Sequence, residues 1–175
     1  MTKKCSIPAV VMSVAALAAC SDMDTRPGAT ASSTLRPASG SQVQGRITFT
    51  QTGTTVRAVG EVTGLTPGLH GFHLHEKGDC SAADATSAGA HFNPGAHKHG
   101  GLQSTERHAG DFGNITADAS GKAVVNVTVS GISVAAGQPN SIPGRGLVVH
   151  AQPDDEKTDP TGNSGGRIAC GVIQG

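Results

Sequence analysis

Aromatic side chains are scarce in this 175-residue chain, which has no tryptophan, no tyrosine and only four phenylalanines. The 25 glycines, with frequent valine and threonine, favour short strands joined by tight turns over a helix bundle. We find no internal repeat and no helical pattern longer than a turn or two. The composition therefore predicts an all-β domain.

An excess of one charge is also lacking, because Lys+Arg and Asp+Glu balance at 13 each. A balanced chain has no strong field to attract a polyanion or an anionic membrane surface. We therefore expect no nucleic-acid partner.

The one long apolar run, Ile7 to Leu17, is too short to cross a bilayer as a helix. It follows Lys3 and Lys4 and ends in the sequence LAAC, whose last residue is Cys20. A basic start, an apolar segment and small residues before a cysteine resemble a bacterial lipoprotein signal. A plain secretory peptide with an incidental cysteine, or a buried helix, is the alternative.

This interpretation divides the chain into a cleaved signal peptide over 1–19, a lipidated flexible tether over 20–41, and a folded domain over 42–175. The tether is expected because its residues are rich in Ser, Thr, Ala, Pro and Gly without apolar periodicity. Cys20 would anchor an exported protein to a membrane of the cell envelope or periplasm. Because Ser21 is not an aspartate, the outer membrane is favoured if the cell has two.

Period-two patterns predict strands from residue 43 onward, with a turn at Gly53-Thr54. Val56, Val59 and Val62 form one such pattern, with an irregularity in its spacing. The expected strands are 43–49, 56–62, 70–76, 114–117, 123–129, 147–150 and 168–173. Two long segments between them, 77–110 and 151–166, have no regular pattern and are expected to be functional loops of an antiparallel sandwich or barrel.

Six histidines and one aspartate within this region suggest metal binding. They are His73, His75, His91, His99, His108, Asp111 and His150. Imidazole and carboxylate donors suit zinc and copper(II), and seven ligands exceed the four that one tetrahedral zinc needs. Period two also places His73 and His75 on one face of their strand. More than one metal site is therefore expected.

Two cysteines, Cys80 and Cys170, remain once Cys5 is removed with the signal peptide and Cys20 carries lipid. An even pair in an exported protein is typical of a disulfide, and a free buried thiol pair is the alternative.

Five motifs resemble the copper–zinc superoxide dismutases in order and approximate spacing. They are GFHLHE (71–76), GAHFNP (89–94), KHGG (98–101), HAGDFGN (108–114) and GRIACGVI (166–173). The resemblance covers the chain from about Gln42 to its end. It implies an eight-stranded antiparallel Greek-key β-sandwich or barrel with two long functional loops.

The resemblance also implies one copper and one zinc per subunit. Copper would be held by His73, His75, His91 and His150, and zinc by His91, His99, His108 and Asp111. His91 would bridge the two metals and take part in catalysis.

Five further roles follow from the same resemblance. Asp154 would join His73 to His99, which orients both rings. Arg167, also catalytic, would attract and orient an anion at copper, and Thr161 would narrow the channel to it. Cys80 and Cys170 would form the intrasubunit disulfide. Of the remaining histidines, His97 is expected to be exposed and His70 to be structural.

The implied activity is disproportionation of superoxide to oxygen and hydrogen peroxide, protecting the cell envelope from extracytoplasmic superoxide. A homodimer is possible. The alternative function is a non-catalytic periplasmic copper- and zinc-binding protein on the same fold. One departure is that family members open with an apolar first strand, whereas residues 32–41 are polar and interrupted by Pro37.

Overall fold

Eight antiparallel strands make up most of the regular structure in this computed structural model, which describes residues 28–175. The expected signal peptide and Cys20 lie outside the described residues. The strands are β1 (Thr30–Pro37), β2 (Gln44–Thr52), β3 (Thr55–Thr63), β4 (Gly68–His75), β5 (Asp111–Ala117), β6 (Ala123–Ser130), β7 (Gly146–His150) and β8 (Arg167–Gln174). Within the described residues, the only helix is the 3₁₀ turn η1 (Thr86–Ala88).

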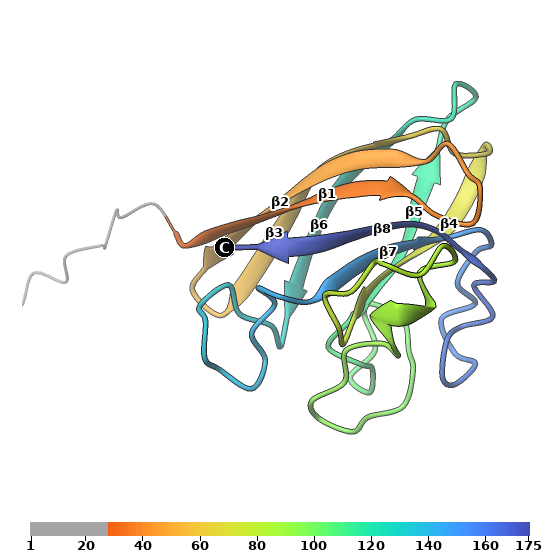
Figure 1. The fold of residues 1–175 in the computed structure, drawn as a ribbon. Coiled ribbons are helices and arrows are strands. Elements are labelled where there is room, and N and C mark those ends of the chain that lie inside the picture. The colour runs from red at the N-terminus through yellow and green to blue at the C-terminus, as the bar shows by residue number, and fades with distance from the viewer. Residues whose placement is uncertain (1–27) are drawn as a thin grey trace, which may run out of the picture.

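The strands close into a barrel in the order β1-β2-β3-β6-β5-β4-β7-β8 (Figure 1). Strands β4, β5 and β6 lie between β3 and β7 in reverse order, so β3 is beside β6 and β7 is beside β4. These two crossovers are Greek-key connections. The prediction of an all-β, eight-stranded antiparallel barrel is confirmed.

Strand β1 corrects the predicted tether, because residues 30–37 are not flexible coil. Ala31, Ser33 and Leu35 point inward and are buried, while β1 pairs with β2 on one side and β8 on the other. Two of the three inward residues are small, so the strand shows little hydrophobic periodicity in the sequence. Its two ladders nevertheless close the barrel.

Strand β3 differs from its predicted pattern at one residue. Val56, Ala58 and Val62 are fully buried, whereas Val59 is 40% exposed. Side chains alternate strictly along a strand, so Val59 must face away from the side that Val56 and Val62 share.

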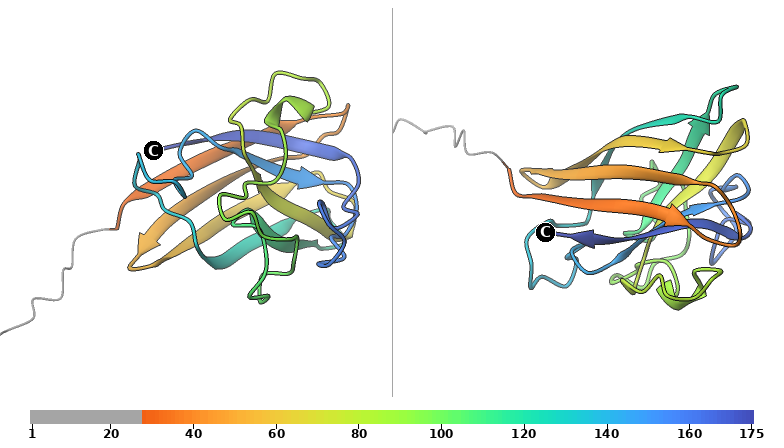
Figure 2. Two further views of the ribbon diagram at one scale, coloured as in Figure 1. Left: turned by 90° about the horizontal axis from the view of Figure 1, so that it is seen from below. Right: turned by 45° about the horizontal axis from the view of Figure 1, so that its top comes forward.

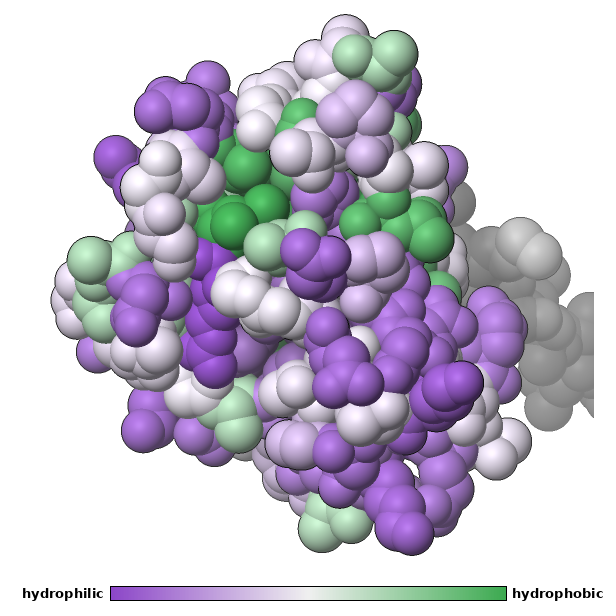
Figure 3. Space-filling model, turned by 90° about the vertical axis from the view of Figure 1, so that its right-hand side faces the viewer, coloured by the Kyte–Doolittle hydropathy of each residue, from purple (hydrophilic) through white to green (hydrophobic). Residues whose placement is uncertain are grey.

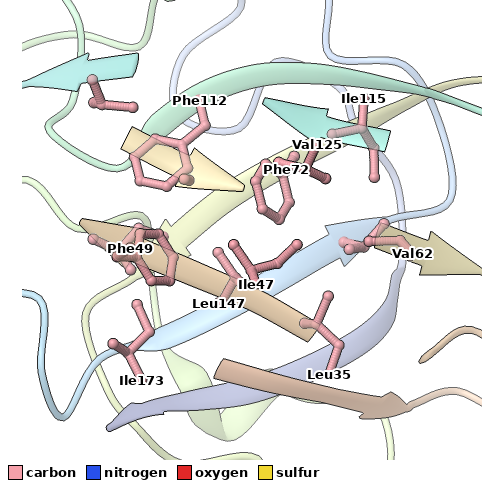
Figure 4. Close-up of a cluster of buried hydrophobic side chains, with 14 of the residues drawn as sticks. Leu35, Ile47, Phe49, Val62, Phe72, Phe112, Ile115, Val125, Leu147 and Ile173 are labelled. Carbon is pink, nitrogen blue, oxygen red and sulfur yellow. The ribbon is translucent and has the colours of Figure 1, made fainter. Parts of the chain in front are cut away.

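The main hydrophobic core contains the four phenylalanines, three from strands and Phe92 from the loop after β4. Phe72 and Phe112 meet edge to face with ring centroids 5.8 Å apart, among aliphatic side chains from the surrounding strands (Figure 4). Burial of such a ring contributes about 1.5–3 kcal/mol. The scarce aromatic residues are therefore concentrated in the core.

Three irregular connections lie outside the ladders, at residues 76–110, 131–145 and 151–166. The first and third extend from one side of the barrel, away from the end where β1 begins and β8 finishes (Figures 1 and 2). The surface in the lower part of Figure 3 is mostly hydrophilic. No helix among residues 28–175 is both long and apolar enough to cross a membrane.

Candidate metal centre

The first cluster of ligand side chains is built mainly on two neighbouring strands. His73 and His75 lie on β4, on the opposite face from Leu74, which packs in the hydrophobic core. His150 ends β7, which pairs with β4, and His91 joins from the 76–110 loop through a β-bridge to His75. All four histidines are buried, and one ring nitrogen from each lies within 4.8 Å of the others.

The outer ring nitrogens of this cluster are already engaged. His75 Nδ1 donates to the carbonyl of Gly89 (2.9 Å), and His150 Nδ1 donates to that of Gly165 (3.1 Å). The Nε2 atoms of these two histidines then carry the lone pairs, and the two nitrogens are 3.4 Å apart. His73 Nδ1 and His91 Nε2 are buried without a hydrogen-bond partner. Four converging lone pairs fit a bound cation, and four imidazoles suit copper.

The second cluster gathers around a single carboxylate. Asp111 Oδ1 lies 2.8 Å from His91 Nδ1 and 3.1 Å from the Nδ1 atoms of both His99 and His108. The other oxygen, Oδ2, accepts the backbone N–H groups of Gly100 (3.1 Å) and His108 (2.8 Å). Three imidazoles and one carboxylate, all buried, fit a tetrahedral zinc site.

The two clusters are joined in two places. His91 directs Nδ1 toward the zinc set and leaves Nε2 free on the copper side. Asp154, as placed by the resemblance, accepts hydrogen bonds from His73 Nε2 (2.7 Å, at Oδ2) and His99 Nε2 (2.9 Å, at Oδ1). These bonds leave His73 Nδ1 and His99 Nδ1 to face the metals.

Burial keeps three of the copper-set imidazoles neutral. Desolvation lowers the pKa of His91 to about 4 and that of His150 to about 3, and it lowers the pKa of His75 well below 6.5. Only a neutral imidazole has a lone pair for a metal, so these rings are available as ligands at neutral pH.

His99 in the zinc set has the opposite electrostatic balance. Desolvation opposes charge on His99, but its bonds with Asp111 and Asp154 prevail and raise its pKa to about 10. Desolvation likewise opposes ionisation of both aspartates, yet the histidine bonds hold their pKa values below 3.8. The carboxylates therefore remain negative and attract a cation.

Arg167 stands beside the copper set. Its guanidinium donates to the carbonyls of Ala85 (2.7 Å) and Gly89 (2.6 Å), and the Gly89 carbonyl also accepts from His75 Nδ1. The pKa of His150 is lowered mainly by desolvation and by the neighbouring histidines. The positive charge of Arg167 makes a smaller contribution in the same direction. An anion that reaches copper therefore meets a fixed cation.

The predicted disulfide between Cys80 and Cys170 is present, with an S–S distance of 2.02 Å. It links the first loop to β8, close in sequence to the Ala85 and Gly89 carbonyls that hold Arg167. The bond therefore ties the support of the guanidinium to the barrel.

Three other predicted residues lie around the two clusters. Thr161 is exposed and lines a surface opening together with His91. His97 has a side chain that is 49% exposed. His70 is buried, with Nδ1 2.8 Å from the His150 carbonyl and Nε2 2.9 Å from that of Thr66. As expected, His97 is exposed and His70 is structural.

Two supporting residues were not predicted from the sequence. Asn114 Nδ2 donates to the Asp154 carbonyl (2.9 Å), and its Oδ1 accepts the Asp154 N–H (2.7 Å). Arg107 donates to the carbonyls of His108 (2.8 Å) and Ser130 (2.9 Å), which ties the zinc loop to the end of β6. Their only sequence signal is the HAGDFGN motif, which Arg107 precedes and Asn114 ends.

Comparison with known proteins agrees with this geometry. Residues 43–173 match the family model described as copper/zinc superoxide dismutase (SODC). A solved structure described as that of the clock protein EA4 shares 40% sequence identity, with a TM-score of 0.76. That match covers 85% of this chain and 95% of the other. With both metal-ligand sets intact, this chain belongs to the copper/zinc superoxide dismutase family of oxidoreductases.

Proposed function

We propose that this protein disproportionates superoxide in the extracytoplasmic space, yielding oxygen and hydrogen peroxide. The observation that carries the proposal is the pair of complete ligand sets that share His91, with Arg167 fixed beside the copper set. A protein that only stores metal has no need of a guanidinium at the metal's edge.

Bound copper would supply the chemistry that no side chain can, a one-electron couple between Cu(II) and Cu(I). Two superoxide ions and two protons give one oxygen molecule and one hydrogen peroxide. Arg167 attracts and orients each anion, and Thr161 narrows its path. His91 Nε2 has no hydrogen-bond partner in the protein, so this nitrogen would be the place for one of the two protons whenever it is not bound to metal.

The remaining residues keep this arrangement rigid. His73, His75 and His150 present their free nitrogens from paired strands, and Asp154 fixes the ring of His73. Asp111 gathers the residues that would hold zinc and lies 2.8 Å from His91 Nδ1, so it helps to fix the orientation of the His91 ring.

The direct test is superoxide consumption by protein loaded with copper and zinc, compared with the same concentration of free copper. We expect turnover far above free copper, and anomalous scattering at the two metal edges should place copper and zinc on opposite sides of His91. A metal-loaded protein no more active than free copper would instead support the alternative binding function.

We also propose that Cys20 anchors the protein to a membrane of the cell envelope, with the outer membrane favoured if there are two. The support is the LAAC sequence after a short apolar run. Metabolic labelling with a palmitate analogue should mark the native chain but not the Cys20→Ser variant. Equal labelling of both chains would refute the anchor.

A further inference from the structure

The 151–166 loop brings one more carboxylate to the zinc ligands, and it belongs to neither ligand set. Asp159 Oδ1 accepts the backbone N–H of His99 at 2.8 Å. The same oxygen lies 3.7 Å from Nε2 of His108. Both histidines come from the other long loop, so Asp159 joins the two loops at the zinc site.

His99 is thereby held at two independent points. Asp154 fixes its ring through Nε2, and Asp159 fixes its backbone. Two points of attachment define both the place and the orientation of the imidazole, whereas one would leave it free to pivot. An outer partner of this kind affects metal affinity by roughly 10–100-fold.

Asp159 faces the ring nitrogen of His108 that points away from Asp111. His108 Nδ1 is 3.1 Å from Asp111 Oδ1, on the metal side, and Nε2 is on the Asp159 side. A carboxylate there favours the proton on Nε2, which leaves the Nδ1 lone pair for zinc.

The position of Asp159 also makes it the outer wall of the site. The side chain of His108 is 5% exposed, whereas that of Asp159 is 55% exposed. Asp159 lines the same surface opening as His91, His108 and Thr161. Water or a competing chelator that approaches the zinc ligands by this route passes Asp159.

We propose that Asp159 is a positioning residue that retains zinc by holding the His99 backbone and the His108 ring. The contacts of Asp159 are with the zinc ligands His99 and His108. Its effect on zinc retention can therefore be measured whether or not the protein turns over superoxide.

The test measures zinc release from protein loaded with both metals into excess of a chromogenic chelator. We expect Asp159→Ala to release zinc about 10-fold faster or more, with copper content unchanged. Asp159→Asn keeps an oxygen that can accept the His99 N–H, so it should restore much of the retention.

A matched control is Glu106→Ala, which removes the same charge from the zinc-bearing loop. The side chain of Glu106 is 69% exposed, and its carboxylate lies 3.9 Å from the ring of the exposed His97. We expect its zinc release to match that of the unchanged protein. If Glu106→Ala accelerated zinc release as much as Asp159→Ala does, loss of negative charge alone would explain both effects. That result would overturn the proposal.

A second readout does not need zinc. Amide hydrogen exchange at His99 in the metal-free protein should be faster in Asp159→Ala than in Glu106→Ala, because only the former loses the acceptor. Cobalt(II) placed in the zinc site should also show a changed visible spectrum in Asp159→Ala alone. Unchanged release and exchange, or loss of copper together with zinc through a global drop in Tm, would contradict the assignment.

Discussion

The copper and zinc sets share one histidine but are built in different ways. Three of the four copper ligands lie on β4 and β7, where inter-strand hydrogen bonds fix the backbone. In the zinc set only Asp111 belongs to a strand, as the first residue of β5. His99 and His108 lie in the 76–110 loop, and carboxylates hold them instead of a ladder.

The difference indicates what each site needs in order to form. The copper set is preorganised by the barrel, so its geometry should survive without either metal. The zinc set is organised by Asp111, whose two oxygens together contact three rings and two backbone N–H groups. Removal of one side chain should therefore disrupt the zinc set, whereas the copper set should tolerate it.

The largest expected effect is that of Asp111→Ala. This substitution removes a side chain that is both a zinc ligand and the carboxylate that organises the other ligands. The zinc content should therefore fall to near zero after dialysis. The free energy of unfolding should fall by about 3–5 kcal/mol, because buried partners lose their counter-charge. Metal analysis should still find copper bound; stoichiometric zinc in this variant would contradict the assignment.

The next effect is loss of the disulfide in the Cys80→Ala/Cys170→Ala variant. The bond closes a loop spanning 90 residues in sequence, and its removal should cost about 2–5 kcal/mol in urea unfolding. Copper should stay bound through its strand ligands, while activity falls because the loop that supports Arg167 loosens. Unchanged stability would show that β8 and the first loop are held together by other contacts.

A third prediction concerns pH: in the metal-free protein, His91 and His150 affect stability with one sign and His99 with the opposite sign. His91 and His150 have pKa values lowered from 6.5 to about 4 and about 3, so stability should fall as pH drops below 6.5. The lowered pKa values of the aspartates act in the same direction. His99 is raised to about 10, so its contribution is complete below 6.5 and lost as pH rises through 10.

Thermal unfolding of the metal-free protein from pH 4 to 10 should therefore show a maximum of Tm near pH 6.5. A Tm that rises steadily across the alkaline range would contradict the role assigned to His99.

The smallest expected effect is that of Arg167→Gln on the loaded enzyme. Activity as kcat/KM should fall about 10-fold and become less dependent on ionic strength, because a local positive charge is lost. Copper and zinc contents should not change. Arg57→Gln provides the control, since Arg57 is exposed on the outer face of β3, where it donates a hydrogen bond to Asn126. An equal loss of kcat/KM in this variant would contradict a special role for Arg167.

Much of the metal centre was predictable because its ligands are carried by short motifs. The alternation of His73, Leu74 and His75 predicts two ligands on one face, and the structure places them so. The cysteine pair predicts the disulfide in the same direct way. Such features depend on a few consecutive residues or on residue type alone.

Other features depend on packing between distant segments, which one sequence does not reveal. The inward residues of β1 include Ala31 and Ser33, so the strand is defined by its neighbours β2 and β8 more than by its own pattern. Asp159 resembles any exposed loop acid until the second loop folds against His99. The amide of Asn114 acquires its role only where β5 meets the backbone of Asp154.

The contacts of Asp154 have a mechanical consequence. His91 links the two metal positions on one side, and the path His73–Asp154–His99 links them on the other. With one connection, the two sites could rotate relative to each other about it. Two connections on different sides restrict that rotation. The separation and the mutual tilt of the two sites are thus both constrained. Because the path through Asp154 consists of protein side chains alone, it would keep the two sites joined whether or not His91 binds both metals.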